Sequence, residues 1–542
     1  MKKLLSFILC NMAIGLYANN ITITNVRLID KNTSAGLNNQ ANYTKIQFDV
    51  QWLNSWRTNI GSANWDAAWI FAKYRIGNGE WHHAKIHNTD NIAPIGSIIT
   101  TGLQTPGLPY NSITNPGIGA FIYRNTNGSG TITLNNVRLR WNYGMDAVRD
   151  NEVVDVQVYA IEMVYVPQGA FDAGDGSSTK YIQGQFRNGS INEPVNITSE
   201  AALTLGGKAN GNLSNNNGVG MTPADDFNDT VTKYLPATFP KGFNAFYSMK
   251  YEITQQQYVD FLNTLNRTQQ NSRTGTALSA GTTTVENKYV MSNTKYLYRR
   301  NSIRCDTIIS ATNPIVFYCD LNGNDIGSEY NDGQFIACNY MSFMDVAAYL
   351  DWSGLRPMTE LEFEKACRGT KNAVIDEYAW GTTVVIGADN LIFSGQECET
   401  TTTVGANVNF NNYAGVDGPI KVGAFATSNT SREQSGSSFY GIMEMSGNMY
   451  ERTVTVGNIN GRAFTGINGD GVLSKNGNAN ETGWPGFDAT TGEVKSAAGA
   501  GFRGGVSVYS SINLRVSARN VATRMNYYRH VGYGGRGIRT AP

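Results

Sequence analysis

Apolar and polar residues alternate along five segments in the first third of the chain. A period of two places one side of each segment toward a core and the other toward water, which is typical of β-strands. Turns rich in Asn and Gly separate the segments, so an all-β, sandwich-like domain is predicted over residues 19–161. The segments are Ile21–Ile29, Thr44–Trp52, Ala67–Ile76, Thr131–Trp141 and Glu152–Ile161.

Tryptophans are concentrated in the same region. They could form an aromatic platform that binds sugar, or they could fill the core and rim of the sandwich, and the second interpretation is favoured. The residues are Trp52, Trp56, Trp65, Trp69 and Trp81.

Helix signals are few and occur later in the chain. Thr254 stands three residues before Gln257, and Thr359 stands three residues before Glu362. Both pairs match a capping box, in which two side chains satisfy each other's free backbone amides at a helix start. The segment 342–354 adds an apolar helical face that ends at a glycine. Short helices are therefore predicted within a landscape of strands and loops.

The composition agrees with the predicted strands, turns and short helices, and it argues against two classes of binding partner. The chain has 542 residues, 58 of them Gly, with 16% charged residues and a formal net charge of +0. Abundant glycine favours turns and long loops over long helices. A neutral chain gives no reason to expect nucleic acid or an anionic membrane as a partner.

The N-terminus predicts export. Lys2 and Lys3 precede a short apolar run, Leu4–Leu16, and the small residue Ala18 follows. This is the pattern of a secretory signal peptide over residues 1–18, and no later segment is apolar for long enough to form a transmembrane segment. The predicted location is the periplasm, the cell surface or the extracellular space.

Eight motifs from Glu162 onward resemble, in order, those of the formylglycine-generating enzyme or sulfatase-modifying factor family. The resemblance implies an α+β, C-type-lectin-like, loop-rich fold over residues 162–542, with insertions at about 174–240 and 266–335. The motifs are EMVYVPQGAFDAGD (162–175), YSMKYEITQQQYVDFLN (247–263), MSFMDVAAYLDWSGLRPMTELEFEKACRG (341–369), YAWG (378–381), VGAF (422–425), YGIMEMSGNMYERT (440–453), FRGG with LRVSAR (502–519) and GGRGIRT (534–540).

The resemblance also implies two calcium sites. Calcium prefers a mixture of carboxylate and backbone oxygens in a tight turn, and both segments contain such groups. The first site would use the carboxylates of Glu444 and Glu451 with the carbonyls of Gly447 and Met449. The second would use Asn407, the Val408 carbonyl, Asp417 and the Pro419 carbonyl.

The chain departs from the family where its members bind copper. The resemblance implies an oxidoreductase that uses copper(I), a soft ion held by two cysteines. In this chain the corresponding stretch, Gly504–Arg519, contains no cysteine, and none occurs after Cys398. Tyr509 and Ser511 stand nearest the expected positions. Copper is therefore not expected, and no catalytic residues are assigned.

Two functions remain. The first is a non-catalytic binding or structural protein at the cell surface, which would recognise a protein or a glycan. The segment Arg524–Gly535 is rich in Tyr and Arg, as recognition surfaces are, although it could instead pack over the former active cleft. The alternative is an oxidoreductase of the same family with an altered site. The expected ligand-binding residues are Tyr509, Tyr527, Tyr528 and Arg529.

The cysteines leave the disulfide pattern open. An exported protein can oxidise its thiols. Cys305 with Cys319 and Cys338 with Cys367 are two conceivable pairs, and the family resemblance places Val516 where the usual partner of Cys367 would be.

Overall fold

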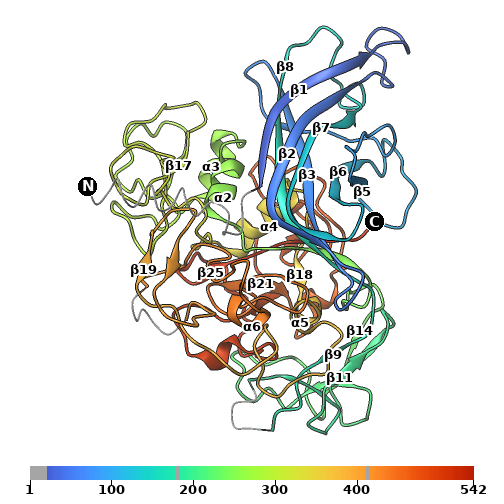
Figure 1. Ribbon diagram of the computed structural model, residues 1–542, viewed down its shortest axis with the longest axis vertical. Coiled ribbons are helices and arrows are strands. Elements are labelled where there is room, and N and C mark those ends of the chain that lie inside the picture. The colour runs from blue at the N-terminus through green and yellow to red at the C-terminus, as the bar shows by residue number, and fades with distance from the viewer. Residues whose placement is uncertain (1–20, 179–182, 411–415) are drawn as a thin grey trace.

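The computed structural model describes residues 21–178, 183–410 and 416–542, so the predicted signal peptide lies outside the described residues. Strands of the N-terminal part form two sheets, visible at the top of Figure 1. A three-stranded antiparallel sheet has the order β1-β2-β7, and a larger sheet has the order β26-β15-β8-β3-β6-β5 with β4 paired to β3. The bounds are β1 Thr22–Asn32, β2 Tyr43–Arg57, β3 Asp66–Ile76, β4 His82–His83, β5 Ser97–Leu103, β6 Gly117–Arg124, β7 Gly128–Trp141, β8 Val154–Val166, β15 Phe246–Met249 and β26 Ile538–Thr540.

The two sheets enclose a core, as a sandwich requires. Phe48 and Trp52 of β2 meet Ile70 of β3 and Leu139 of β7 in one buried cluster. The alternation in the sequence arises because every second side chain of these strands enters this cluster. Trp52 and Trp69 are 0% exposed, in agreement with the favoured interpretation of these tryptophans as core residues.

Strand β8 joins the N-terminal part to the rest of the chain. It pairs along its length with β3 and, at its C-terminal end, with β15. The expected boundary between residues 161 and 162 therefore falls inside a strand. Phe71 of β3 packs edge-on against Trp352 of the later helix α4 (Phe343–Trp352), with ring centroids 5.0 Å apart. The two parts of the chain therefore share the larger sheet, and the face of β3 opposite the sandwich core belongs to the core of the later part.

The remaining elements are short, in keeping with a loop-rich mixed fold. The predicted capping boxes of Thr254 with Gln257 and Thr359 with Glu362 are both present. None of the helices in the described ranges is long and apolar enough to cross a membrane. The helices are α2 Gln255–Leu262, α3 Arg267–Arg273, α4 Phe343–Trp352, α5 Glu360–Arg368, α6 Arg432–Ser435, α7 Ile459–Arg462 and the 3-10 helix η1 Ser511–Leu514. The central sheet consists of β18 Met358–Thr359, β21 Tyr450–Val454, β24 Ala500–Arg503 and β25 Tyr533–Gly534. Two further hairpins are β19 Leu391–Ile392 with β20 Thr400–Thr401 and β22 Phe487–Asp488 with β23 Glu493–Val494.

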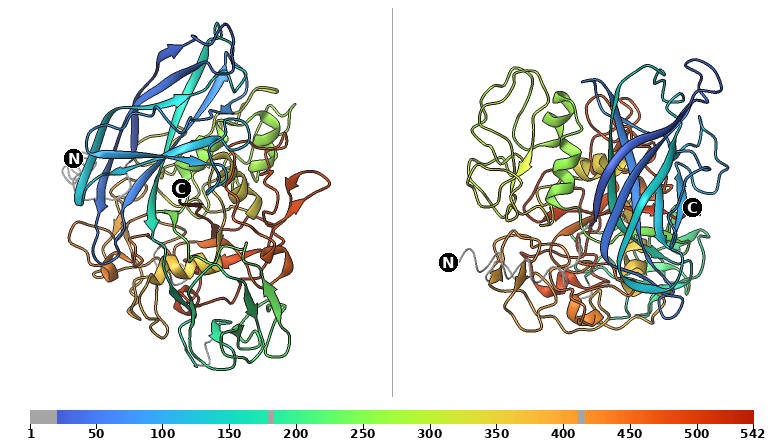
Figure 2. Two further views of the ribbon diagram at one scale, coloured as in Figure 1. Left: turned by 90° about the vertical axis from the view of Figure 1, so that its right-hand side faces the viewer. Right: turned by 45° about the horizontal axis from the view of Figure 1, so that its top comes forward.

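The two predicted insertions are structured and lie at different ends of the molecule. The first, which contains β10 to β14, lies below the central sheet, whereas the second, with α3 and β17, lies beside the N-terminal strands (Figures 1 and 2). The bounds are β9 Phe171–Ala173, β10 Phe186–Asn188, β11 Val195–Ile197, β12 Leu203–Leu205, β13 Leu213–Asn215, β14 Lys233–Leu235, β16 Ile303–Arg304 and β17 Tyr318–Cys319.

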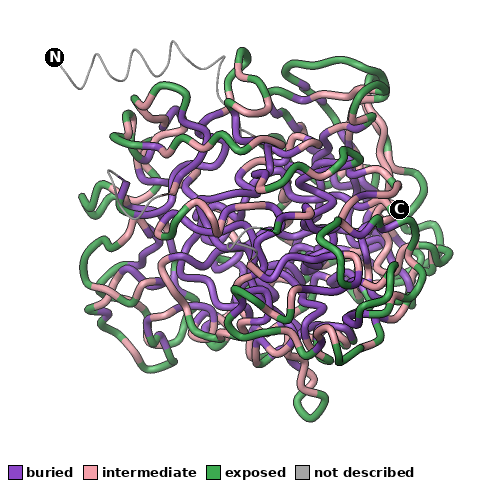
Figure 3. Tube along the Cα trace, turned by 90° about the horizontal axis from the view of Figure 1, so that it is seen from below, coloured by how far each residue is buried: buried purple, intermediate pink, exposed green. Residues whose placement is uncertain are grey.

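Charged residues of the motifs form a buried ionic network beneath the central sheet. The Glu360 carboxylate accepts hydrogen bonds from Arg519 at 2.6 and 3.0 Å and lies 3.2 Å from Arg503. Arg503 also bonds Glu364 at 2.7 Å, and Arg519 also bonds Asp225 of the first insertion at 2.8 Å. All five side chains are 0% exposed. Figure 3 shows the buried interior to which they belong, with exposed loops around its rim.

Neither conceivable disulfide forms. Cys305, Cys319, Cys338 and Cys367 are free thiols, and all four are buried. Cys367 nevertheless lies in the same apolar cluster as Val516, where the family resemblance places its usual partner. A valine thus fills this space by packing rather than by a covalent bond.

Candidate functional site in the C-terminal loops

The first predicted calcium loop is buried and acidic. Glu444 accepts a hydrogen bond from the Gly423 amide at 2.6 Å on Oε1, while its buried Oε2 has no hydrogen-bond partner among the described residues. Burial raises the pKa of the Glu444 carboxyl to about 7. Glu451 differs, because its carboxylate forms an ion pair with Arg536 at 2.6 Å. Glu444 thus has an unpaired oxygen that can bind a cation, whereas the charge of Glu451 is already neutralised by Arg536.

The tight turn of this loop depends on glycine. Gly447 has a φ of 89°, and a Cβ at this position would lie 2.2 Å from Cγ2 of Val408. Both the backbone conformation and the lack of space exclude a larger residue. The same contact shows that the two predicted calcium loops pack directly on each other.

Glu252 is a residue of this site that the sequence analysis missed. Its carboxylate accepts hydrogen bonds from the Met449 amide at 3.0 Å and from the Asn448 amide group at 2.5 Å. Burial, together with repulsion from Glu444 and Glu451, raises its pKa well above the usual value. Glu252 belongs to the motif at 247–263, so the motif was a signal that could have marked it.

The second predicted loop gives a different picture. The side chain of Asn407 accepts a hydrogen bond from the Ile386 amide at 3.0 Å and is 3% exposed. Asp417 has a side chain 65% exposed and forms an ion pair with Arg299. Val408, which follows Asn407, and Pro419, two residues after Asp417, are both buried. The two side chains that would bind calcium therefore have separate partners.

Aromatic rings occupy the region where the family has its copper-binding cysteines. Tyr509 lies 5.9 Å from Tyr450, which lies 5.5 Å from Phe502, measured between ring centroids. The run continues from Phe502 to Tyr533 at 4.3 Å and from Tyr533 to Tyr528 at 5.9 Å. Its inner members are buried, whereas its ends, Tyr509, Tyr528 and the neighbouring Tyr527, are 43%, 49% and 69% exposed.

Arg452 lies inside this aromatic run. Its guanidinium carbon is 4.0 Å from the Phe502 ring centroid and 4.8 Å from that of Tyr533. Nη1 donates a hydrogen bond to the Asn526 carbonyl at 2.8 Å, while Nε and Nη2 are buried without acceptors among the described residues. Burial lowers the pKa of Arg452 to about 9. The π-faces of the surrounding rings thus provide most of the electrostatic compensation for the buried guanidinium charge.

Arg529, expected to bind a ligand, is committed to the fold. Its guanidinium donates two hydrogen bonds to Asp345, at 2.7 and 2.8 Å, and a third to the Ser272 carbonyl at 2.9 Å. Tyr509, Tyr527 and Tyr528 are thus exposed, with Tyr509 at one end of the aromatic run and Tyr527 and Tyr528 at the other, whereas Arg529 is directed inward. Ser342 and Asp345 form the capping box of α4, so this pair also supports the start of that helix.

Comparisons with known proteins agree with the motifs. Residues 151–534 match the family described as "Sulfatase-modifying factor enzyme 1-like domain". Because this match covers well over half of the chain, the protein belongs to that family. No curated protein matches the chain. Among solved structures, the Major Tropism Determinant U1 variant aligns over 69% of this chain and 83% of its own, at 13% identity and a TM-score of 0.19, which is too distant to support a conclusion.

Proposed function

We propose that this protein is a non-catalytic member of the sulfatase-modifying factor family that binds a protein or glycan at the cell surface. The observation that carries the proposal is the aromatic run. One exposed end is Tyr509, near the position where the family resemblance places the reactive thiols, and the other exposed end is Tyr528 with the neighbouring Tyr527. Tyrosine side chains supply large, rigid contact areas with a polar tip and are enriched in recognition surfaces.

Three further expectations accompany this proposal. Residues 162–542 adopt the C-type-lectin-like arrangement of the family, the chain is exported by its signal peptide, and calcium supports the loop around Gly447. For calcium, the free oxygen of Glu444 fits a hard cation, with the carbonyls of Gly447 and Met449 as further ligands. Glu451 fits less well because it is paired with Arg536. The partners of Asn407 and Asp417 give no support to a second ion.

The sharpest test of the missing activity is a direct assay of the family's reaction. Purified protein is incubated with copper(I), oxygen and a peptide containing the sulfatase sequence C-x-P-x-R. We expect no aldehyde by mass spectrometry, because Gly504–Arg519 supplies no thiolate to hold the soft ion. Aldehyde that persists after contaminating metal is removed would favour the alternative, an oxidoreductase with an altered site.

The binding surface is tested by removing its exposed rings. Candidate ligands are found with a glycan array and a pull-down of surface proteins, and affinities are then measured for Tyr527→Ala/Tyr528→Ala. We expect binding to weaken by about tenfold or more, since aromatic anchors dominate recognition surfaces. A matched control is Tyr234→Ala/Tyr296→Ala, whose rings are 67% and 74% exposed outside this run. Equal affinities for both double variants would place the binding surface elsewhere.

A further inference from the structure

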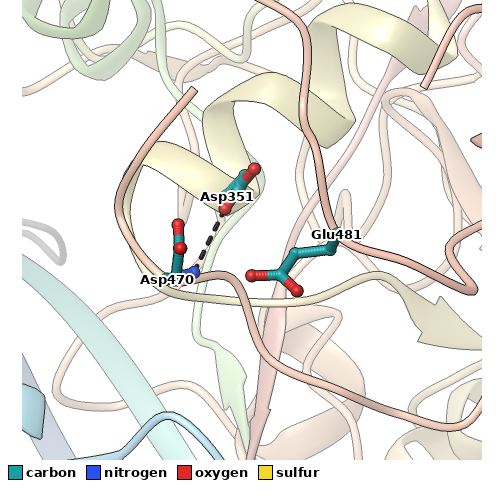
Figure 4. A group of neighbouring side chains, drawn as sticks. All are labelled: Asp351, Asp470 and Glu481. Atoms are coloured by element: carbon teal, nitrogen blue, oxygen red, sulfur yellow. Dashed lines mark hydrogen bonds between the residues drawn. The ribbon is translucent and has the colours of Figure 1, made fainter. Parts of the chain in front are cut away.

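Three carboxylates converge where the C-terminal end of α4 meets the loop around residues 466–484. Asp351 extends from α4, and Asp470 and Glu481 extend from the loop. Each offers a carboxylate oxygen, and these oxygens all lie within 4.8 Å of one another. Figure 4 shows the Glu481 side chain extending from its part of the loop toward Asp351 and Asp470. Within residues 21–178, 183–410 and 416–542, no other group of three His, Cys, Asp or Glu side chains lies this close.

Backbone hydrogen bonds hold two of these carboxylates in place. Asp351 accepts from the Asp470 amide at 3.2 Å on Oδ1 and from the Asn480 amide at 3.0 Å on Oδ2. Asp470 accepts from the Val472 amide at 2.8 Å. Each oxygen retains a lone pair after these bonds, because a carboxylate can accept about four. The helix end and both branches of the loop are thereby fixed around a common point.

One carboxylate oxygen of Glu481 lacks such a partner. Glu481 is 6% exposed, and its Oε1 is buried without a hydrogen-bond partner in the described part of the chain. A buried, unpaired carboxylate oxygen is costly, and other carboxylates beside it increase the cost. Because the Glu481 side chain points toward Asp351 and Asp470, its carboxylate is placed to bind a cation together with theirs.

The nearest lysine does not supply that cation. Lys73 of β3 donates its hydrogen bonds to the carbonyls of Trp352 and Gly471, both at 2.7 Å, and no described bond joins it to the three carboxylates. Burial lowers its pKa to about 7 in spite of the nearby acids. One weakly basic lysine leaves the acidic group without sufficient compensation.

We propose that Asp351, Asp470 and Glu481 bind a calcium ion, at a site separate from the loop around Gly447. The ligands are all carboxylate oxygens, which select a hard cation over zinc or copper. Two oxygens on opposite sides of a calcium ion lie about 4.6–5.2 Å apart, twice the usual bond length, and neighbouring ligands lie closer, so oxygens within 4.8 Å of one another fit its coordination sphere. Asp470 is partly exposed, so water and ions can reach the cluster from its side, and the neighbouring residues Lys73, Trp352 and Gly471 line part of a cavity of 560 Å³.

Binding of the ion links separate elements of the fold. The ion joins the loop to α4, while the hydrogen bonds of Lys73 join strand β3 to the carbonyls of Trp352 in α4 and Gly471 in the loop. Calcium would thus stabilise the contact between the N-terminal sheets and the rest of the fold. Neither the recognition surface nor the family's copper chemistry is involved.

Calcium titration of the chelator-treated full chain by calorimetry tests this site. We expect Glu481→Gln to lose one bound ion, or to bind it at least about tenfold more weakly, because one charged ligand is removed. The substitution keeps the shape of the side chain and breaks no described hydrogen bond of Oε1. Asp488→Asn, in the partly exposed strand β22 that follows the loop, is the matched control and should titrate like the wild type.

Two more variants keep the result unambiguous. Glu444→Gln changes the other predicted calcium loop and should leave this site intact. Asp470→Asn, at a partly exposed position, serves if Glu481→Gln does not fold. The melting temperature should rise with calcium in the wild type and respond less in Glu481→Gln. Identical titrations for the wild type, Glu481→Gln and Asp470→Asn would overturn the proposal.

Discussion

Replacing Arg519 with methionine should lower the free energy of unfolding by about 3–5 kcal/mol. Arg519 is 0% exposed and pairs with both Glu360 and Asp225. Methionine keeps only the apolar stem of the side chain, so Asp225 loses the cation that pairs with it and Glu360 retains only Arg503. The desolvation of an unpaired buried charge, and not the attraction lost, accounts for most of this cost.

Urea denaturation followed by circular dichroism measures the effect of Arg519→Met. The control is Arg75→Met, since the Arg75–Asp155 pair has side chains 34% and 55% exposed and contributes about 0–1 kcal/mol. Adding Glu360→Gln and Asp225→Asn to Arg519→Met should restore part of the loss, because no unpaired charge then remains. A loss below about 1 kcal/mol for Arg519→Met would show that the network contributes little.

Replacing Trp69 with alanine should cost a similar amount, about 3–5 kcal/mol, and should shift the unfolding of the whole chain. Trp69 is 0% exposed on β3. Its indole nitrogen donates to the Ser353 carbonyl at 2.8 Å, just after α4, and Arg539 of β26 covers its ring at 4.4 Å. The side chain therefore connects the N-terminal sheets to both the middle and the end of the chain.

A single cooperative transition is the expected form of this unfolding, because β8 belongs to the strand pairing of both parts. Trp81→Ala is the control. Trp81 is partly exposed, and its main described contact is with the Arg75 side chain, so its loss should cost about 1 kcal/mol. Two separate transitions, of which Trp69→Ala moves only the first, would show instead that residues 19–161 fold as an independent domain.

Local structure was largely predictable from the sequence. The alternating segments Thr44–Trp52 and Ala67–Ile76 lie within β2 and β3, because a period of two matches the pleat of a strand with one buried face. Capping boxes at Thr254 and Thr359 were equally readable, since their hydrogen bonds close within a few residues. The order of the motifs was sufficient to identify the family that the comparison confirms.

Contacts between distant segments were not predictable in this way. The pairing of β8 with β15 joins residues 80 or more positions apart, for example Val166 with Phe246. Arg529 looked like a surface residue by composition, and only the fold shows Asp345 beside it. Glu481 belongs to no sequence motif. Its proximity to Asp351 depends on where the C-terminal end of α4 lies in the folded chain.

The sequence by itself determined the strands, the helix starts, the family and the lack of cysteine in Gly504–Arg519. These properties are encoded in neighbouring residues or in a motif order that survives insertions. The tertiary structure alone decided that both parts share one core, that the motif charges neutralise one another, and that Asp351, Asp470 and Glu481 meet. Burial and electrostatics act through distance in space, and residues 119 or more positions apart, such as Asp351 and Asp470, become neighbours only once the chain has folded.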